Sequence, residues 1–151
     1  MPSLHLFPKA DVPVVQVALP AGYGPAQVYA MGQALAGLRE QGVLVVGSGS
    51  MTHNLSEFFG GKREAVPYVT EFSRWVEAAI ERGDKAALFD YRNKAPHAQR
   101  AHPSEDHFMP LFFALGAAGW GESNEAAPVK ADYLSREVMY GILAMDSFAL
   151  A

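Results

Sequence analysis

Two short apolar runs on either side of one helical segment place the strongest constraint on the fold of this chain. Residues 13–19 form a β-branched run behind a proline, and residues 43–46 form a continuous apolar run. Between them, apolar residues recur at helical spacing over residues 26–41, and Gly42 follows as a stop signal. The pattern predicts a strand, a helix and a second strand that is buried on both faces. Such a βαβ unit favours a right-handed parallel crossover and an α/β fold.

The rest of the chain predicts helices that flank a mixed sheet. Residues 67–82 are amphipathic, residues 85–91 predict a short helix, and residues 108–118 predict a buried helix. Residues 93–106 are polar and predict a loop. The two final strands are expected at residues 127–133 and 138–148. The 151 residues fit one domain, residues 1–151, of the α/β class.

Charge and composition restrict the classes of function. With 12 basic and 16 acidic residues and no basic stripe, the chain is not expected to bind nucleic acid. The absence of cysteine excludes disulfide scaffolds and thiol catalysis, and a reducing cytoplasm is the simplest compartment. Neither a signal peptide nor a membrane-spanning run is predicted, so no membrane partner is expected. Half of the residues are hydrophobic, which indicates surface buried against a partner or a further part of the domain.

The second predicted strand runs directly into Gly47-Ser48-Gly49, with His53 a few residues later. Loops at the carboxyl ends of parallel strands hold ligands in α/β folds, which makes His53 a candidate functional residue. The spacing matches neither nucleotide-binding glycine pattern nor the nucleophile elbow of hydrolases, so phosphate binding and a serine nucleophile are disfavoured. The alternative is a tight turn that lets the backbone pass close to a neighbour, with His53 as a hydrogen-bonded structural residue.

A second polar cluster, His102 to His107, comes just before the apolar helix predicted at residues 108–118. Imidazole and carboxylate ligands together suit divalent iron, zinc or manganese. His107 could point into a pocket from the first turn of that helix. The alternative is a capping loop in which Ser104 or Asp106 caps the helix, and capping is compatible with metal binding.

Four segments, spread over nearly the whole chain, carry a resemblance to one known family. They are GVLVVGSGSMTHNL at residues 42–55, HPSEDHFMPLFFALGAAG at residues 102–119, FPKADVPVVQVAL at residues 7–19 and GILAMDSF at residues 141–148. The first resembles the strand-and-loop signature of class III extradiol ring-cleavage dioxygenases of the 4,5-DOPA dioxygenase type, and the second resembles another signature of that family. The other two are also similar to family segments, and together these matches are far more specific than any single motif.

The resemblance implies a mixed α/β sheet flanked by helices and a non-haem Fe(II) that binds both hydroxyls of a catechol and then O₂. Zn(II) could replace the iron in the purified protein. The resemblance gives His107 the role of a metal ligand and His53 that of an acid/base or oxygen-steering residue beside the metal. His102, Ser48 and Asn54 are expected to line the substrate site. DOPA, protocatechuate-like acids and simpler catechols all remain open as substrates.

The sequence departs from the family pattern at its beginning. The family pattern opens with a Ser-His-Gly-Ser-Pro motif and a further histidine, which supply the other two metal ligands, and His5 does not match either of them. We therefore expect residues 1–151 to correspond to the C-terminal part of the catalytic domain. The isolated chain is expected to be inactive, or to act with a complementing polypeptide or as a homo-oligomer.

Two other functions stay open at this point. One is a non-catalytic remnant that keeps the architecture and acts as a subunit or binding module. The other is a zinc-dependent hydrolase or lyase, which metal analysis and a test for an oxygen requirement would separate from a dioxygenase.

Overall fold

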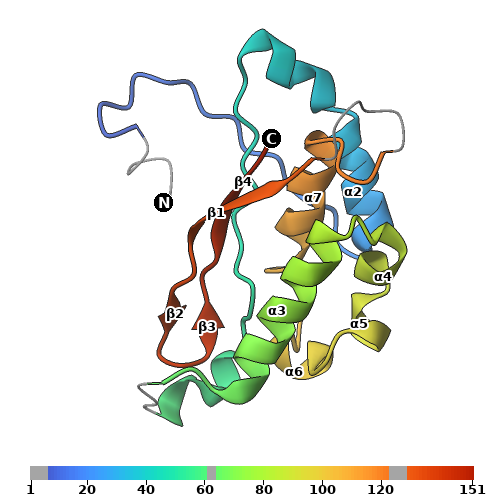
Figure 1. Cartoon of the computed structure of the whole chain (residues 1–151). Coiled ribbons are helices and arrows are strands. Elements are labelled where there is room, and N and C mark those ends of the chain that lie inside the picture. The colour runs from blue at the N-terminus through green and yellow to red at the C-terminus, as the bar shows by residue number, and fades with distance from the viewer. Residues whose placement is uncertain (1–6, 61–63, 123–128) are drawn as a thin grey trace.

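The computed structural model describes residues 7–60, 64–122 and 129–151, and Figure 1 shows helices gathered on one side of a β-hairpin arm. Within the described residues, no helix has both the length and the apolar character needed to cross a membrane. The elements in chain order are α2 (Pro25–Gln33), η1 (Ala36–Gln41), η2 (Leu55–Gly60), α3 (Pro67–Glu81), α4 (Lys85–Phe89), α5 (Tyr91–Lys94), α6 (Ala98–Ala101), α7 (Met109–Ala117), β1 (Ala131–Ser135), β2 (Val138–Met139), β3 (Leu143–Ala144) and β4 (Ser147–Leu150).

The arm consists of two small antiparallel sheets, in which β1 pairs with β4 and β2 pairs with β3. Helices and strands are thus both present, and the predicted α/β class is confirmed. The run expected as one strand at residues 138–148 is divided into β2, β3 and β4. Tyr140 and Gly141 both have positive φ, 54° and 71°, and they form the tight reversal that separates β2 from β3. The start of the other expected strand, residues 127 and 128, lies outside the described residues.

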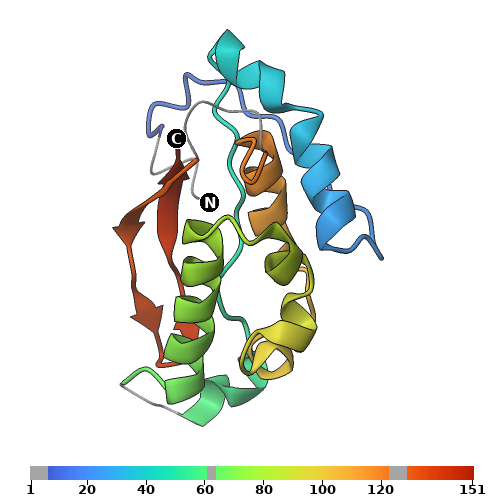
Figure 2. The same ribbon diagram turned by 45° about the vertical axis from the view of Figure 1, so that its right-hand side comes forward.

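Helix α3 lies between the hairpin arm and the short helices α4, α5 and α6 (Figure 2). Its prediction from apolar periodicity is confirmed to within one residue, and Pro67 occupies the first turn, where a missing N–H costs nothing. The residues on its predicted apolar face are all buried: Val69, Phe72, Val76, Ala79 and Ile80. The prediction of a loop at residues 93–106 is wrong in part, because this range contains the end of α5 and the single turn α6.

Helices α2 and α7 pack against each other at very short range because each presents a glycine to the backbone of the other. A Cβ atom on Gly32 would lie 2.1 Å from the carbonyl oxygen of Phe113. A Cβ atom on Gly116 would lie 2.0 Å from the carbonyl oxygen of Tyr29. Helix α7 itself is almost entirely apolar and matches the prediction of a buried helix. These reciprocal glycines are what allow α2 to cover α7.

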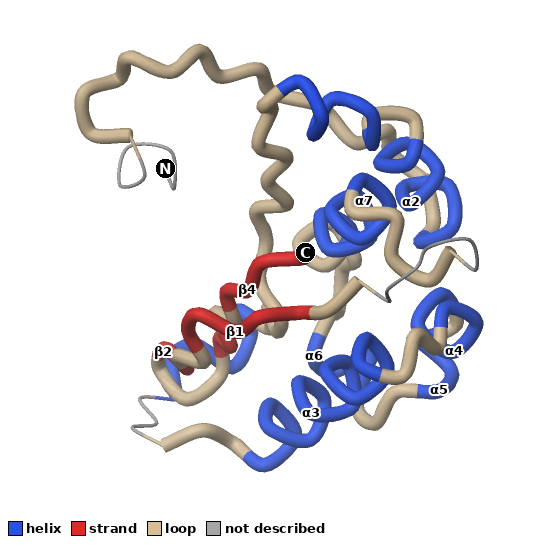
Figure 3. Tube along the Cα trace, turned by 45° about the horizontal axis from the view of Figure 1, so that its top comes forward, coloured by secondary structure: helices blue, strands red, loops and turns tan. Residues whose placement is uncertain are grey.

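The βαβ unit expected at the start of the chain is not formed. Residues 13–19 and 43–46 are extended, but neither run is a strand, and most of their side chains are exposed. Extended backbone becomes a strand only when a neighbour accepts and donates its hydrogen bonds, and no such neighbour occurs in the described part of the chain. Figure 3 shows the first of these runs within a long loop that arches away from the helices. The helix between the runs is present as α2 and η1, and Gly42 ends it with a φ of 79°.

Replacing Gly116 with alanine is expected to destabilise the chain. The added methyl would overlap the Tyr29 carbonyl, and overpacking of this kind costs about 1–3 kcal/mol, more than the gain of up to about 1 kcal/mol in helix propensity. Urea unfolding followed by circular dichroism measures the change. Gly37→Ala is the matched control, because a Cβ there meets nothing within 4 Å. Equal stability of the two variants would show that the helices can separate without cost.

Candidate functional site

The loop from Ser50 to His53 carries the first candidate histidine, and backbone hydrogen bonds attach it to the loop that carries the second. The Ser50 N–H donates to the His107 carbonyl at 3.1 Å, and the His53 N–H donates to the Ala101 carbonyl at 2.8 Å. Segments that are separated by about fifty residues in the sequence are therefore held side by side. Sequence spacing alone could not have predicted this pairing.

The opposite side of the same loop is attached to the β-hairpin arm through Thr52. This side chain is fully buried, and its hydroxyl donates to the Ile142 carbonyl at 2.7 Å and accepts from the Ala144 N–H at 2.8 Å. The Met51 N–H also donates to the Ala144 carbonyl, at 2.9 Å. The His53 loop is thus fixed from two directions. Sequence reasoning missed Thr52, because one threonine in a polar loop carries no pattern.

The rings of His53 and His107 are stacked, with centroids 3.6 Å apart and planes inclined by 19°. Burial, and after it the charge that His107 can carry, lowers the pKa of His53 below its usual value. His53 is therefore predominantly neutral at pH 7 and able to accept a proton. The Asp106 carboxylate lies 3.4 Å from His107 Nε2, and the His107 side chain is 44% exposed. The structure thus brings together the two histidines that the sequence singled out, at an open surface.

His102 lies beneath this pair and is fully buried. Its Nε2 lies 2.8 Å from the Met51 carbonyl, which can only accept, so Nε2 carries the proton. Phe72 and Phe108 pack around the ring, with centroids 5.6 and 4.7 Å away. The expected contact of His102 with substrate stays a prediction. Its surroundings are better explained by a positioning role, because the Met51 carbonyl that it binds belongs to the His53 loop.

The loop that carries His107 is fixed by two residues of α5. The Tyr91 hydroxyl donates to the Glu105 carboxylate at 2.7 Å, and Arg92 donates to the His102 carbonyl at 3.1 Å. The capping loop that stood as the alternative for this cluster is not formed by Ser104 or Asp106. Helix α7 has Phe108 at its N-cap position and no side-chain cap hydrogen bond. The position and orientation of His107 therefore depend on the packing of its loop and on the hydrogen bonds from α5 to that loop.

Ser48 and Asn54, the two other residues expected at a substrate site, differ in their surroundings. Ser48 is exposed between two glycines that pass close to other backbone. A Cβ atom on Gly47 would lie 2.3 Å from the Pro110 carbonyl of α7, and one on Gly49 would lie 2.2 Å from the carbonyl of His107, which precedes α7. The expected tight backbone approach is thus present. Asn54 is buried, and its side chain accepts from the Ser56 N–H at 3.2 Å and donates to Glu57 at 3.2 Å. Contact of Ser48 and Asn54 with substrate stays a prediction.

The described residues do not by themselves fit a non-haem iron site. Such a site uses three protein ligands and leaves positions open for substrate and oxygen. Within residues 7–60, 64–122 and 129–151, no group of three histidine, cysteine, aspartate or glutamate side chains is placed to hold a metal ion. His53 and His107 offer two imidazoles at most, so further donors are needed for a metal-dependent reaction.

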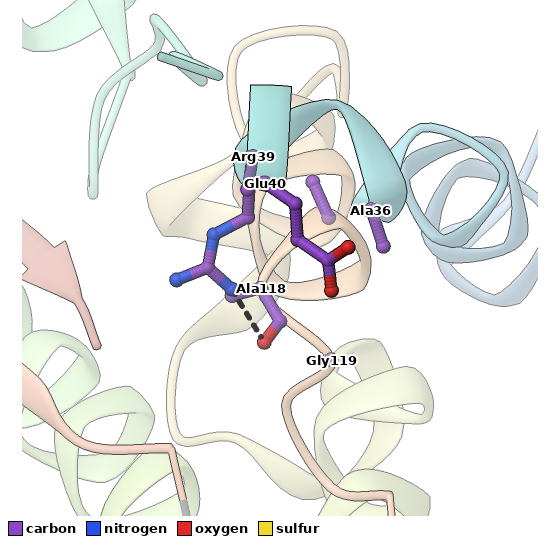
Figure 4. A pocket seen from close by; sticks show the side chains of 6 residues that line it. Ala36, Arg39, Glu40, Ala118 and Gly119 are labelled. Atoms are coloured by element: carbon purple, nitrogen blue, oxygen red, sulfur yellow. Dashed lines mark hydrogen bonds between the residues drawn. The ribbon is translucent and has the colours of Figure 1, made fainter. Parts of the chain in front are cut away.

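A surface hollow of about 420 Å³ lies elsewhere, at the C-terminal end of α7 (Figure 4). Arg39 donates there to the Ala118 carbonyl at 3.1 Å and so satisfies one of the free carbonyls at the end of the helix. The hollow is separated from His107 by the whole length of α7, roughly 13 Å for nine residues. It is lined by Ala36, Arg39, Glu40, Ala117, Ala118 and Gly119, and we assign it no part in the histidine site.

The described residues thus form an α/β fold that presents two histidines on adjoining, hydrogen-bonded loops. Residues 2–142 match the family described as the catalytic LigB subunit of aromatic ring-opening dioxygenase, and the chain belongs to that family. The resemblance seen in the sequence is thereby confirmed.

Several curated relatives share the match. The 4,5-DOPA dioxygenase extradiol of Beta vulgaris is 38% identical over 79% of this chain and 44% of its own length. That of Portulaca grandiflora is 33% identical over 98% of this chain and 52% of its own length. An uncharacterized protein of Escherichia coli K12, known from a crystal structure, superposes with a TM-score of 0.82 at 27% identity, covering 97% of this chain and 58% of its own. The chain spans about half the length of the curated relatives.

The burial of His102 is expected to make stability depend on pH. Burial lowers the pKa of His102 from 6.5 to about 4. Between pH 6.5 and about pH 4, the unfolded chain therefore binds a proton at this histidine that the folded chain does not bind. The free energy of unfolding therefore falls as the pH drops from about 6.5 to about 4, by up to roughly 3 kcal/mol. Urea unfolding across this range measures the slope.

His102→Asn should weaken that slope, because asparagine does not titrate. The control His97→Asn should retain it, since His97 is exposed and has a φ of 59° that asparagine tolerates. An unchanged slope in His102→Asn would assign the pH dependence to other groups.

Proposed function

We propose that this chain contributes to the extradiol cleavage of a catecholic aromatic ring by O₂, with Fe(II) as the metal. The observation that carries the proposal is the stacked pair of His53 and His107, which the fold holds on two hydrogen-bonded loops in a member of the dioxygenase family. DOPA- and protocatechuate-like compounds are the substrate class that we propose. The cytoplasmic location expected from the sequence stays a prediction.

We assign His53 the role of an acid/base. Its lowered pKa leaves the imidazole free to accept a proton from a catechol hydroxyl at neutral pH, and the reverse transfer would return the proton to the opened product. The backbone of His53 is bonded to Ala101, so the ring keeps its position as the proton moves. The Met51–His102 hydrogen bond supports the same loop from below.

We assign His107 the role of a metal ligand. It is the more exposed ring of the pair, and the carboxylate of Asp106 beside it would favour its interaction with a cation. Since the described residues do not complete a metal site, the proposal includes donors from a complementing polypeptide or from a second copy of the chain. Zn(II) is the metal that we expect as a substitute in the purified protein.

A non-catalytic subunit of the same fold is the second candidate function. It is favoured by the same finding, that the described residues hold at most two imidazoles near one another. Oxygen uptake separates the two candidates. The purified chain, loaded anaerobically with Fe(II), is tested with a panel of catechols, alone and co-expressed with the part of the E. coli neighbour that lies outside the match.

Uptake that matches formation of a yellow ring-opened product, in either preparation, supports ring cleavage. We expect it in the co-expressed preparation. Folded protein that binds its partner and consumes no oxygen with any catechol would support the non-catalytic subunit instead.

Alanine variants should separate the roles of the two histidines in whichever preparation is active. His107→Ala is expected to lose most of the bound iron, because it removes a proposed ligand. His53→Ala is expected to keep the iron and lose about 100-fold or more in turnover, the usual contribution of a positioned acid/base. Metal analysis and oxygen uptake give the two readouts, with His97→Ala as a control away from the pair. Equal loss of iron in both variants would make His53 a ligand.

A further inference from the structure

Seven of the thirteen large hydrophobic side chains that are exposed in the described part of the chain lie in two extended segments, residues 11–19 and residues 43–49. Val15 is 86% exposed and Leu44 is 64% exposed, and other valines of both segments are also exposed. β-branched side chains in extended backbone suit a pleated, half-buried surface far better than water. Exposed apolar surface of this extent on a folded chain indicates a binding site for another polypeptide.

The backbone of these segments is also available. In the described part of the chain, the Val43 N–H bonds to the Leu38 carbonyl, but no backbone hydrogen bond is found for residues 11–19 or 44–49. Extended backbone with free N–H and C=O groups is a template on which another strand can pair. Side chains and main chain therefore point to the same kind of partner, an extended polypeptide.

One side of the second segment is already covered by helix. Val45 packs against the core, and a Cβ on Gly47 would lie 2.3 Å from the Pro110 carbonyl of α7. The other side, with Val46 52% exposed, is open. A continuous apolar run such as residues 43–46 is typical of a strand that is covered on both faces and paired on both edges. Segment 43–49 thus has the composition of an interior strand without the neighbours of one.

The lengths of the relatives indicate which partner fits. The E. coli neighbour superposes on nearly all of this chain, yet the match covers only 58% of its own residues. We propose that residues 11–19 and 43–49 bind a strand-forming polypeptide equivalent to the part of the family domain outside this match. Because Gly49 touches the His107 carbonyl, a strand paired with residues 43–49 would run beside the histidine pair. This binding requires neither metal nor substrate, so it can be tested apart from ring cleavage.

The test uses the unmatched part of the E. coli neighbour as the probe, co-expressed with the full chain. A one-to-one complex is expected by light scattering, and hydrogen exchange should slow at residues 11–19 and 43–49. The double variant Val15→Lys, Leu44→Lys should weaken the complex at least tenfold, because it places two charges on the proposed surface. Leu134→Lys, at a residue of β1 that is 72% exposed, is the matched control and should bind normally.

Circular dichroism confirms that each variant is folded, which is expected because all three side chains are exposed. The proposal is overturned if the folded wild-type chain forms no complex, or if the double variant binds as well as the control. It is also overturned if the chain forms a dimer that the double variant alone disrupts, since a second copy would then be the occupant. Slower hydrogen exchange that is confined to the hairpin arm would also overturn the proposal, because the partner would then bind to the arm.

Discussion

The loop from Ser50 to His53 is the connection on which the site depends. It bonds to the His107 loop through Ser50 and His53, and to the hairpin arm through Thr52. Four residues thus join three parts of the chain that are far apart in sequence. The two Thr52 bonds are buried, where a partner left unpaired costs about 1–3 kcal/mol, so the loop has little freedom to move on that side. The stacking of the two histidines follows from that rigidity.

Beneath the loop, the helical side of the molecule is closed and well packed. The glycines of α2 and α7 bring these helices into backbone contact, and α3 supplies a complete apolar face to the core. On the opposite side, residues 11–19 and 43–49 pair with no strand in the described part of the chain, and many of their apolar side chains are exposed. The histidine pair lies where the closed side meets the open one.

The sequence predicted the elements whose partners are local or strongly patterned. The periodicity of α3 and the apolar run of α7 gave their bounds to within one residue at either end, and Gly42 ended the preceding helical segment as expected. The prediction failed for residues 13–19 and 43–46, because a strand is defined by hydrogen bonds to a neighbour and the run itself does not specify one. The capping loop that the sequence left open as an alternative is not formed, since α7 has no side-chain cap hydrogen bond.

For the site, the sequence by itself determined the chemistry that is available: imidazoles at His53 and His107, a carboxylate at Asp106, and motifs of the dioxygenase family. Only the tertiary structure decided their arrangement. It placed the two rings 3.6 Å apart, buried His102 under the Met51 carbonyl, and left Ser48 at the surface. The physical reason is that residue types and local periodicity are encoded one position at a time. Contacts between residues fifty positions apart depend on how complete elements pack.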